Sequence, residues 1–248
     1  MKSAAKTLFA LLLLVGAVFS TLRCFPLSTD GSMKRTALVR REIALRVLGE
    51  FVGRECPGQK VLVVSNPFTQ RKKQSSDVLE FEEAGVRGLK KGWANRIELQ
   101  GIGFPEPDAA LANNPSHRRI DPQTTTPLSF MTTDDAWDNL LRRYPDTDLV
   151  VSLIGLPATL RSLEIWREPK PRFALLLPDL RMIGDCADVK EAFRSGKLAA
   201  VVLEKPGALP ESAPLNRDYR AEFNQRFVLI TSSNADTLTE ESKKIARH

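Results

Sequence analysis

The chain has 248 residues, of which 42% are hydrophobic and 27% are charged, and this balance excludes wholesale disorder. Three cysteines are too few for a disulfide-rich scaffold. The formal net charge is +6, and Lys2, Lys6 and Arg23 near the N-terminus supply part of it. The short basic runs Arg40-Arg41 and 71–73 are interpreted as solvated faces and turns. Since no dense basic stripe is present, we expect no nucleic-acid partner.

Residues 1–22 have the pattern of an export signal. Lys2 and Lys6 precede an apolar run over 8–19, and Val18 and Ser20 suit a cleavage site after Ser20. The run is shorter than the roughly twenty apolar residues that span a membrane. We therefore expect a signal peptide or signal anchor and an extracytoplasmic location, periplasmic or secreted. Any membrane contact is expected only through residues 8–22.

The next two elements set the pattern for the rest of the chain. Residues 33–54 show helical periodicity, with apolar side chains four residues apart (Val39, Ile43, Val47 and Phe51). Residues 60–65 form a short apolar run that ends at Asn66-Pro67. Such a run is typical of a strand buried on both faces of a parallel sheet.

The same alternation continues to the C-terminus. Helical patterns are expected at 77–91, 134–143, 158–166, 189–195 and 235–247, and strands at 96–102, 148–154, 172–177, 199–203 and 226–231. This order predicts a single α/β domain over 33–248, Rossmann-like, with a mainly parallel sheet and helices on both faces. The segments 105–133 and 206–218 are rich in proline or turn residues and are expected to be loops.

Catalytic motifs are missing from the sequence. No Gly-x-Gly-x-x-Gly follows the first strand, and neither a Walker loop nor a Gly-x-Ser-x-Gly elbow is present. The two histidines stand in a predicted loop and at the last position. The carboxylates Asp179, Asp185 and Asp188 could hold a cation, but helix caps and turns explain them better. We therefore expect no catalytic residue, no metal and no cofactor, and we favour a protein that is not an enzyme.

A ligand of an open parallel sheet binds beyond the carboxyl ends of its strands. Those ends carry Asn66, Phe68, Asp179 and Asn234 in this sequence. Neutral hydrogen-bonding groups beside an aromatic ring suit a small polar molecule. These four residues are the predicted ligand-binding site, with Asn234 the least certain member. A Cys56–Cys186 disulfide stays open, because the sequence does not place the two α-carbons.

Several segments resemble type I periplasmic sugar-binding proteins. They are, in order, VLVVSNPFT at 61–69, the helix at 77–91, the helix and strand over 134–155, RFALLLPD at 172–179, VKEAFRSGKLAAVVLEKP at 189–206 and FVLITSSNAD at 227–236. The chain departs from that family between Asp179 and Val189, where the second lobe has almost no room, so one lobe is mostly retained. The resemblance implies an exported, non-catalytic binding domain for a small polar ligand such as a sugar. The alternatives are an envelope interaction or structural protein without a ligand, or a carboxylate-dependent hydrolase; the sequence identifies no protein partner.

Overall fold

The computed structural model describes residues 29–71, 75–110, 124 and 126–239. The predicted export signal at 1–22 lies outside these residues. The chain divides into two compact units, Met1–Thr36 and Ala37–His248. The sheet and the helices that follow it belong to the second unit, which carries every site described below.

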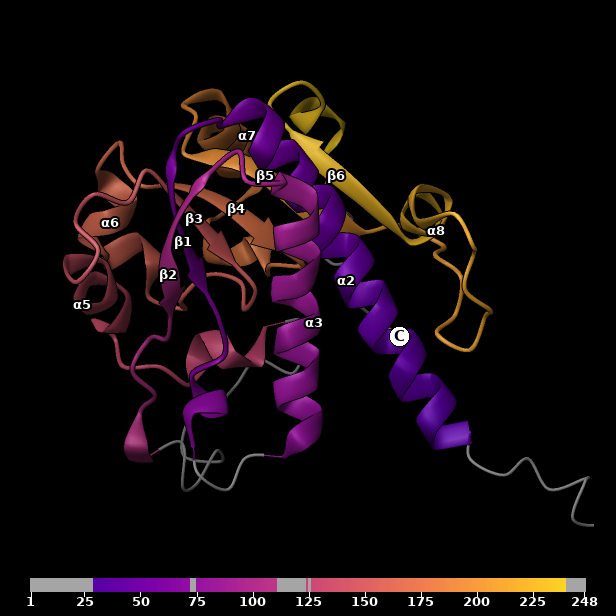
Figure 1. Ribbon diagram of the computed structural model, residues 1–248. Helices are drawn as coiled ribbons and strands as arrows, with labels where there is room; N and C mark the ends of the chain where they lie inside the picture. Colours follow the sequence, from indigo (N-terminus) through magenta and orange to yellow (C-terminus); the bar gives the residue numbers. More distant parts are fainter. Residues whose placement is uncertain (1–28, 72–74, 111–123, 125, 240–248) are drawn as a thin grey trace, which may run out of the picture. The chain divides into compact units, whose positions relative to one another are not determined.

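Six strands form one sheet in the order β2-β1-β3-β4-β5-β6 (Figure 1). Their bounds are β1 Lys60–Val64, β2 Glu98–Gly103, β3 Leu149–Ser152, β4 Arg172–Leu176, β5 Leu198–Glu204 and β6 Phe227–Thr231. The first five strands run parallel, and β6 is antiparallel to β5. The predicted mainly parallel α/β sheet is therefore confirmed. The central strands are continuous runs of Val and Leu because both of their faces are covered.

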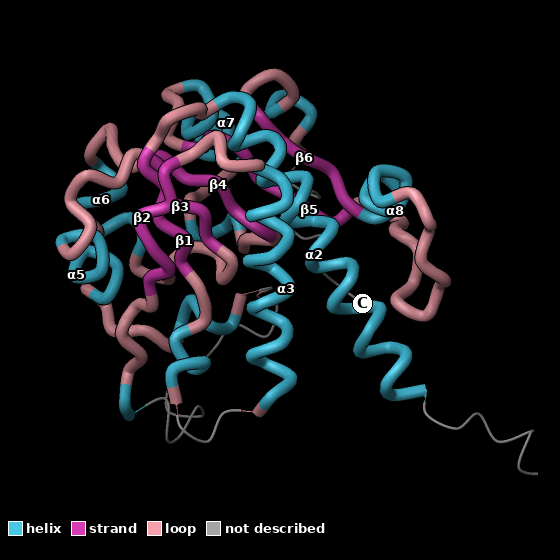
Figure 2. The backbone as a smooth tube through the Cα atoms, viewed as in Figure 1, coloured by secondary structure: helices cyan, strands magenta, loops and turns pink. Residues whose placement is uncertain are grey.

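Helices cover both faces of the sheet, as predicted (Figure 2). One face packs against α2 (Thr29–Glu55) from Ile43 onward, α3 (Ser76–Trp93) and α8 (Tyr219–Arg226). The other face packs against α5 (Ala136–Arg142), α6 (Glu164–Arg167) and α7 (Cys186–Arg194). Alternate side chains of each strand serve the two cores, so that Val61 and Val63 face one and Leu62 and Val64 the other.

Two predicted helices differ from the structure. The segment 158–166 holds a 3-10 turn at Leu160–Ser162 followed by the short α6. The predicted closing helix at 235–247 is wrong where it can be seen: a single 3-10 turn, Ala235–Thr237, is followed by an extended, buried Leu238. Residues 240–248 lie outside the described part of the chain. Leu238 packs into the hydrophobic core in an extended conformation, so the chain does not continue as a helix after Thr237.

The two cysteines in the described part of the chain, Cys56 and Cys186, lie on opposite faces of the sheet and form no disulfide with each other. Cys56 directly follows α2, and its sulfur accepts a hydrogen bond from Arg172 at 3.0 Å. Burial raises the pKa of the Cys56 thiol, and the nearby guanidinium opposes that rise. Cys186 opens α7 and donates to the carbonyl of Leu238 at 3.2 Å. Both thiols are part of local packing.

Helices α2 and α3 approach each other at glycines. A Cβ added at Gly88 would lie 2.2 Å from the carbonyl oxygen of Glu42, and one at Gly49 would lie 2.7 Å from that of Leu89. Both distances are shorter than real Cβ contacts, so the two backbones require glycine at these positions. The close approach brings Arg41 of α2 against Glu82 of α3 at the carboxyl edge of the sheet.

Candidate functional site

A cavity of about 480 Å³ opens at the carboxyl edge of the parallel strands. Its floor consists of residues that follow β3 and end β4, namely Leu153, Ile154, Leu176 and Leu177. In the sheet, β1 has β2 on one side and β3 on the other, so the connections from β1 to β2 and from β2 to β3 run in opposite directions across the sheet. The cavity lies at this point, beside the ends of β1 and β3. Doubly wound sheets bind their ligands at such switch points.

Two helices and a loop segment also line the cavity. Helix α3 contributes Val78, Phe81 and Glu82, and Arg41 comes from α2. On the other side stand 126–128, which belong to the segment predicted as a long loop. Part of that loop therefore packs against the strand ends: the amide of Ala158 donates to Ser129 at 3.1 Å. The cavity remains beside it.

A buried ion pair stands in the wall. The Nη2 of Arg41 lies 2.7 Å from Oε1 of Glu82, and the two side chains are 9% and 10% exposed. The hydroxyl of Ser65, just after β1, donates to Oε2 of Glu82 at 2.6 Å. The ring of Phe81 lies 4.2 Å from the guanidinium carbon. Burial lowers the pKa of Arg41, while the charge of Glu82 opposes the change.

One donor of this guanidinium is unused. The Nε of Arg41 is buried and has no hydrogen-bond partner within the described part of the chain. Gly85 makes room for it, because a Cβ there would lie 3.2 Å from this nitrogen. Buried donors are rarely left unsatisfied, since each costs about 1–3 kcal/mol.

Of the predicted site residues, Asn66 lines this cavity. Its Oδ1 accepts from the amide of Phe68 at 2.9 Å and so caps the 3-10 turn Pro67–Gln70. Phe68 itself is not among the described residues that line the cavity; the guanidinium of Arg71 lies 4.5 Å from its ring. Asp179 is also outside that lining. Its carboxylate is bound by Arg181, with Oδ2 2.6 Å from Nη2 and Oδ1 2.9 Å from Nε.

The expected placement of Asn234 beside the other three is wrong. Because β6 is antiparallel, its carboxyl end lies at the opposite edge of the sheet. Asn234 closes the turn there, since it accepts from the amide of Thr231 at 2.7 Å and donates to the carbonyl of Leu229 at 3.0 Å. It lines a different cavity, together with residues of α2 and β4 such as Glu55 and Arg172.

The three carboxylates that were considered as cation ligands, Asp179, Asp185 and Asp188, act as helix and turn caps. Asp185 accepts from the amide of Asp188 at 2.9 Å, and Asp188 accepts from that of Asp185 at 3.0 Å, which is a capping box at the start of α7. Asp179 similarly caps the turn Leu180–Met182. Within the described ranges, no group of three or more His, Cys, Asp or Glu side chains could hold a metal ion.

Arg41 and Glu82 were not among the predicted site residues. The interpretation of Arg40-Arg41 as a solvated face is wrong, because both side chains are 9% exposed. One signal in the sequence indicates the burial of Glu82: Gly85, Gly88 and Gly92 follow it at the spacing of one helix face. Small residues on one side of a helix permit a neighbour to approach closely and bury what it carries.

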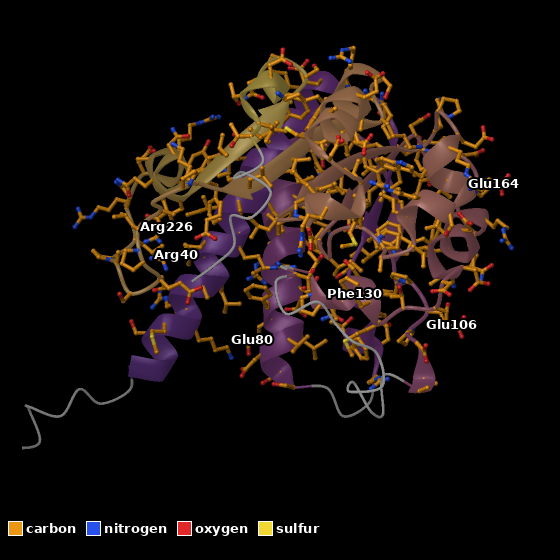
Figure 3. All side chains as sticks on the ribbon, turned by 180° about the vertical axis from the view of Figure 1, so that it is seen from behind. Arg40, Glu80, Glu106, Phe130, Glu164 and Arg226 are labelled. Atoms are coloured by element: carbon orange, nitrogen blue, oxygen red, sulfur yellow. The ribbon has the colours of Figure 1, made fainter. Side chains whose placement is uncertain are left out.

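Arg40, the direct neighbour of Arg41 in sequence, belongs to a second buried cluster. Its Nε lies 3.2 Å from Glu222 Oε1, and the Nε of Arg226 lies 2.6 Å from the same oxygen. Figure 3 shows Arg40 and Arg226 close together. Glu222 Oε2 accepts from the amide of Asn216 at 2.7 Å. The cluster joins α2, α8 and the loop before α8, so its role is structural.

Lys197, at the start of β5, is also buried but is fully engaged. Its Nζ donates to the carbonyls of Ile165, Glu168 and Pro171 at 2.6, 2.6 and 2.8 Å. Burial lowers its pKa to about 8, and the charge of Glu168 opposes this shift. A lysine whose ammonium group donates three hydrogen bonds to backbone carbonyls holds these backbone segments in place and is not positioned to act as a nucleophile.

Comparison with known proteins gives similarity of structure only. No family model matches the chain, and no curated protein matches it in sequence. A sugar ABC transport substrate-binding protein from Bordetella parapertussis is 18% identical, with a TM-score of 0.47, over 82% of this chain and 59% of its own. An arabinose-binding protein from Geobacillus stearothermophilus is 10% identical, with a TM-score of 0.44, over 81% and 63%.

A periplasmic solute-binding protein from Actinobacillus succinogenes, solved with D-allose, is 7% identical, with a TM-score of 0.42, over 82% and 62%. The chain therefore spans less than two thirds of the length of each of these proteins. By their descriptions all three are binding proteins, and the chain is similar in structure to part of each.

Proposed function

We propose that this chain is a non-catalytic binding domain that holds a small polar ligand, such as a sugar, in the strand-end cavity. The observation that carries the proposal is the cavity itself, which stands at the switch point of the sheet beside a buried Arg41–Glu82 pair. Asn66 contributes its amide at the same edge. Phe68 and Asp179 do not line the cavity, and their contact with the ligand stays a prediction that the same titrations test.

The arrangement favours binding over chemistry. Both oxygens of Glu82 accept hydrogen bonds, from Arg41 and Ser65, and Arg181 occupies both oxygens of Asp179. A general base must have an oxygen within reach of the proton that it removes. Carboxylates held in this way are suited to positioning donors, so the hydrolase alternative has less support than the binding domain.

Filling the cavity tests the proposal. We expect Val78→Trp, on the cavity side of α3, to weaken the binding of a sugar at least tenfold, because the indole occupies the space of the ligand. The matched control is Leu79→Trp, whose position is exposed and does not line the cavity. Isothermal titration calorimetry of the parent and both variants with a panel of monosaccharides measures the effect.

Two results would contradict this proposal. Equal affinities of the two tryptophan variants would place the sugar elsewhere on the protein. A parent that binds no member of the panel would favour the alternative of an envelope interaction protein, in which 126–128 act as a plug over the strand ends.

We also propose that the domain works outside the cytoplasm. The support is the apolar run at 8–19 after Lys2 and Lys6. Across the described residues, no helix combines the length and apolar character needed to cross a membrane. A charge in the run, Leu12→Arg, is expected to keep the full-length chain in the cytoplasm, whereas the parent fractionates outside it. Cytoplasmic, full-length parent protein would refute the export proposal.

A further inference from the structure

A further cavity of about 510 Å³, the α5 cavity, is lined by α5, by the 3-10 turn Pro67–Gln70 with Arg71, and by residues 104–107 after β2. Asn66, directly before the turn, lines the strand-end cavity instead. The two cavities share no lining residue in the described part of the chain. The α5 cavity is therefore a separate space, and its volume lies in the range of sites for small molecules.

The walls of the α5 cavity are held in place by the fold. From α5 and the residue after it come Ala136, Asn139 and Arg143, at the i, i+3, i+7 spacing of one helix face. The segment 104–107 is fixed by a hydrogen bond from the amide of Thr133 to the carbonyl of Glu106 at 3.0 Å. An antiparallel bridge between Pro107 and Thr132 holds the same segment. The cavity is therefore formed before a ligand enters it.

Half of the lining is apolar. Among the ten described residues that line the cavity, five carry hydrocarbon or aromatic side chains: Pro67, Phe104, Pro105, Pro107 and Ala136. Phe104 and Pro107 are partly exposed, so they offer apolar surface that a ligand can cover. Covering such surface is favourable, and a proline ring has no side-chain rotamer freedom to lose. This part of the wall suits a ligand with a hydrocarbon body.

The charged side chains of the lining carry an excess of positive charge. Arg71 and Arg143 are exposed, and neither guanidinium forms an ion pair or a hydrogen bond with a described residue. The guanidinium carbon of Arg71 lies 4.5 Å from the centre of the Phe68 ring, a contact that favours one orientation of this side chain. Glu106 is the single carboxylate among the described lining residues. Two accessible guanidinium groups against one carboxylate favour an anion, and guanidinium matches carboxylate and phosphate groups.

We propose that the α5 cavity binds a small organic anion, whose hydrocarbon body lies on Phe104 and Pro107 and whose phosphate or carboxylate group bonds to Arg71 and Arg143. The site is distinct from the strand-end cavity, so the proposal goes beyond the proposed function and does not depend on it. Phosphate and carboxylate offer the same anionic oxygens to a guanidinium, and the test includes one probe of each kind.

Four probes separate the two parts of the ligand. Phenyl phosphate and benzoate combine a ring with an anionic group, inorganic phosphate has no ring, and phenol is neutral at pH 7. Titrations of the full chain are followed by calorimetry and by NMR of backbone amides. We expect phenyl phosphate or benzoate to bind at least tenfold more tightly than inorganic phosphate and phenol, and to shift the amide signals of Phe104 and Glu106. The tighter of the two identifies the anionic group that the site prefers.

Matched variants test the two arginines. Arg71→Gln and Arg143→Gln each remove one guanidinium from the cavity, so we expect either to weaken binding of the preferred probe about five- to tenfold. The control is Arg142→Gln, which makes the same change in net charge at an exposed position in the last turn of α5. Arg142 does not line the cavity, so its replacement should change the affinity less than about twofold.

Several outcomes would overturn the anion site. Equal weakening by Arg142→Gln and Arg143→Gln would mean that anions are attracted to this face without entering the cavity. Inorganic phosphate that binds as tightly as phenyl phosphate would contradict the apolar contact, and failure of both ring anions to bind would refute the site itself.

The variant Val78→Trp separates this proposal from the proposed function. It fills the strand-end cavity and should leave the affinity for phenyl phosphate and benzoate unchanged, because Val78 does not line the α5 cavity. Loss of anion binding in Val78→Trp would place the anion in the strand-end cavity and overturn the inference. A parent that binds the ring anions but no monosaccharide would contradict the proposed function alone.

Discussion

Replacement of Gly88 by valine is expected to lower the free energy of unfolding by about 3 kcal/mol or more, enough to unfold a marginal domain. The new Cβ would lie 2.2 Å from the carbonyl oxygen of Glu42 and 3.1 Å from the amide nitrogen of Arg46. Both neighbours are backbone atoms, which cannot rotate away as a side chain can. The helices α2 and α3 must therefore move apart, and the core between them loses its packing.

The matched control is Lys90→Val, two residues along α3 on its exposed side. It introduces the same β-branched residue into the same helix without a clash, so its cost should stay near the helix-propensity difference, within about 0.5 kcal/mol. Urea denaturation followed by circular dichroism gives both values. Similar midpoints for the two variants would mean that α2 and α3 do not pack at Gly88 as described.

The strands were predictable because their information is local. The parallel strands β1, β3, β4 and β5 are mainly apolar runs buried on both faces, as in Val61–Val64, and this pattern can be recognised from the sequence of each strand alone. The direction of β6 was not predictable from its own residues. It depends on the path of the preceding loop and on α8, a polar helix whose buried apolar residue is Phe223.

The residues of the candidate site also differ in whether the local sequence predicts them. Asn66 could be predicted, because it follows a recognisable strand and the ends of parallel strands share an edge. Arg41 and Glu82 could not be predicted from helical periodicity, since each belongs to a helix whose polar positions have the pattern of a solvent-exposed face. Their burial results from the close approach of α2 and α3, which occurs at glycines of both helices such as Gly49 and Gly88. Helical periodicity describes one helix at a time and contains no information on that approach.

The buried cluster around Glu222 gives the second large effect. Glu222→Gln is nearly isosteric, yet it removes the negative charge that compensates Arg40 and Arg226, which lie 3.2 and 2.6 Å from Oε1. Breaking a buried ion pair on one side costs about 3–5 kcal/mol, because the remaining charges stay buried. The control is Glu191→Gln in α7, where the partner Arg194 and the carboxylate are both exposed. Such surface pairs contribute about 0–1 kcal/mol.

The effect of Glu222→Gln should also depend on pH. Burial raises the pKa of Glu222, but the hydrogen bonds from the Asn216 amide, Arg226 and Arg40 outweigh it and hold the pKa below its ordinary value. A carboxyl group whose pKa is lowered by folding stabilises the fold above its unfolded-state pKa, roughly 4.3. That contribution is lost as the pH falls through the folded-state value. The stability difference between parent and variant should therefore be largest near pH 7 and shrink below about pH 4. A difference that stays constant between urea titrations at pH 7 and pH 3.5 would mean that the charge of Glu222 does not hold the two arginines in the folded domain.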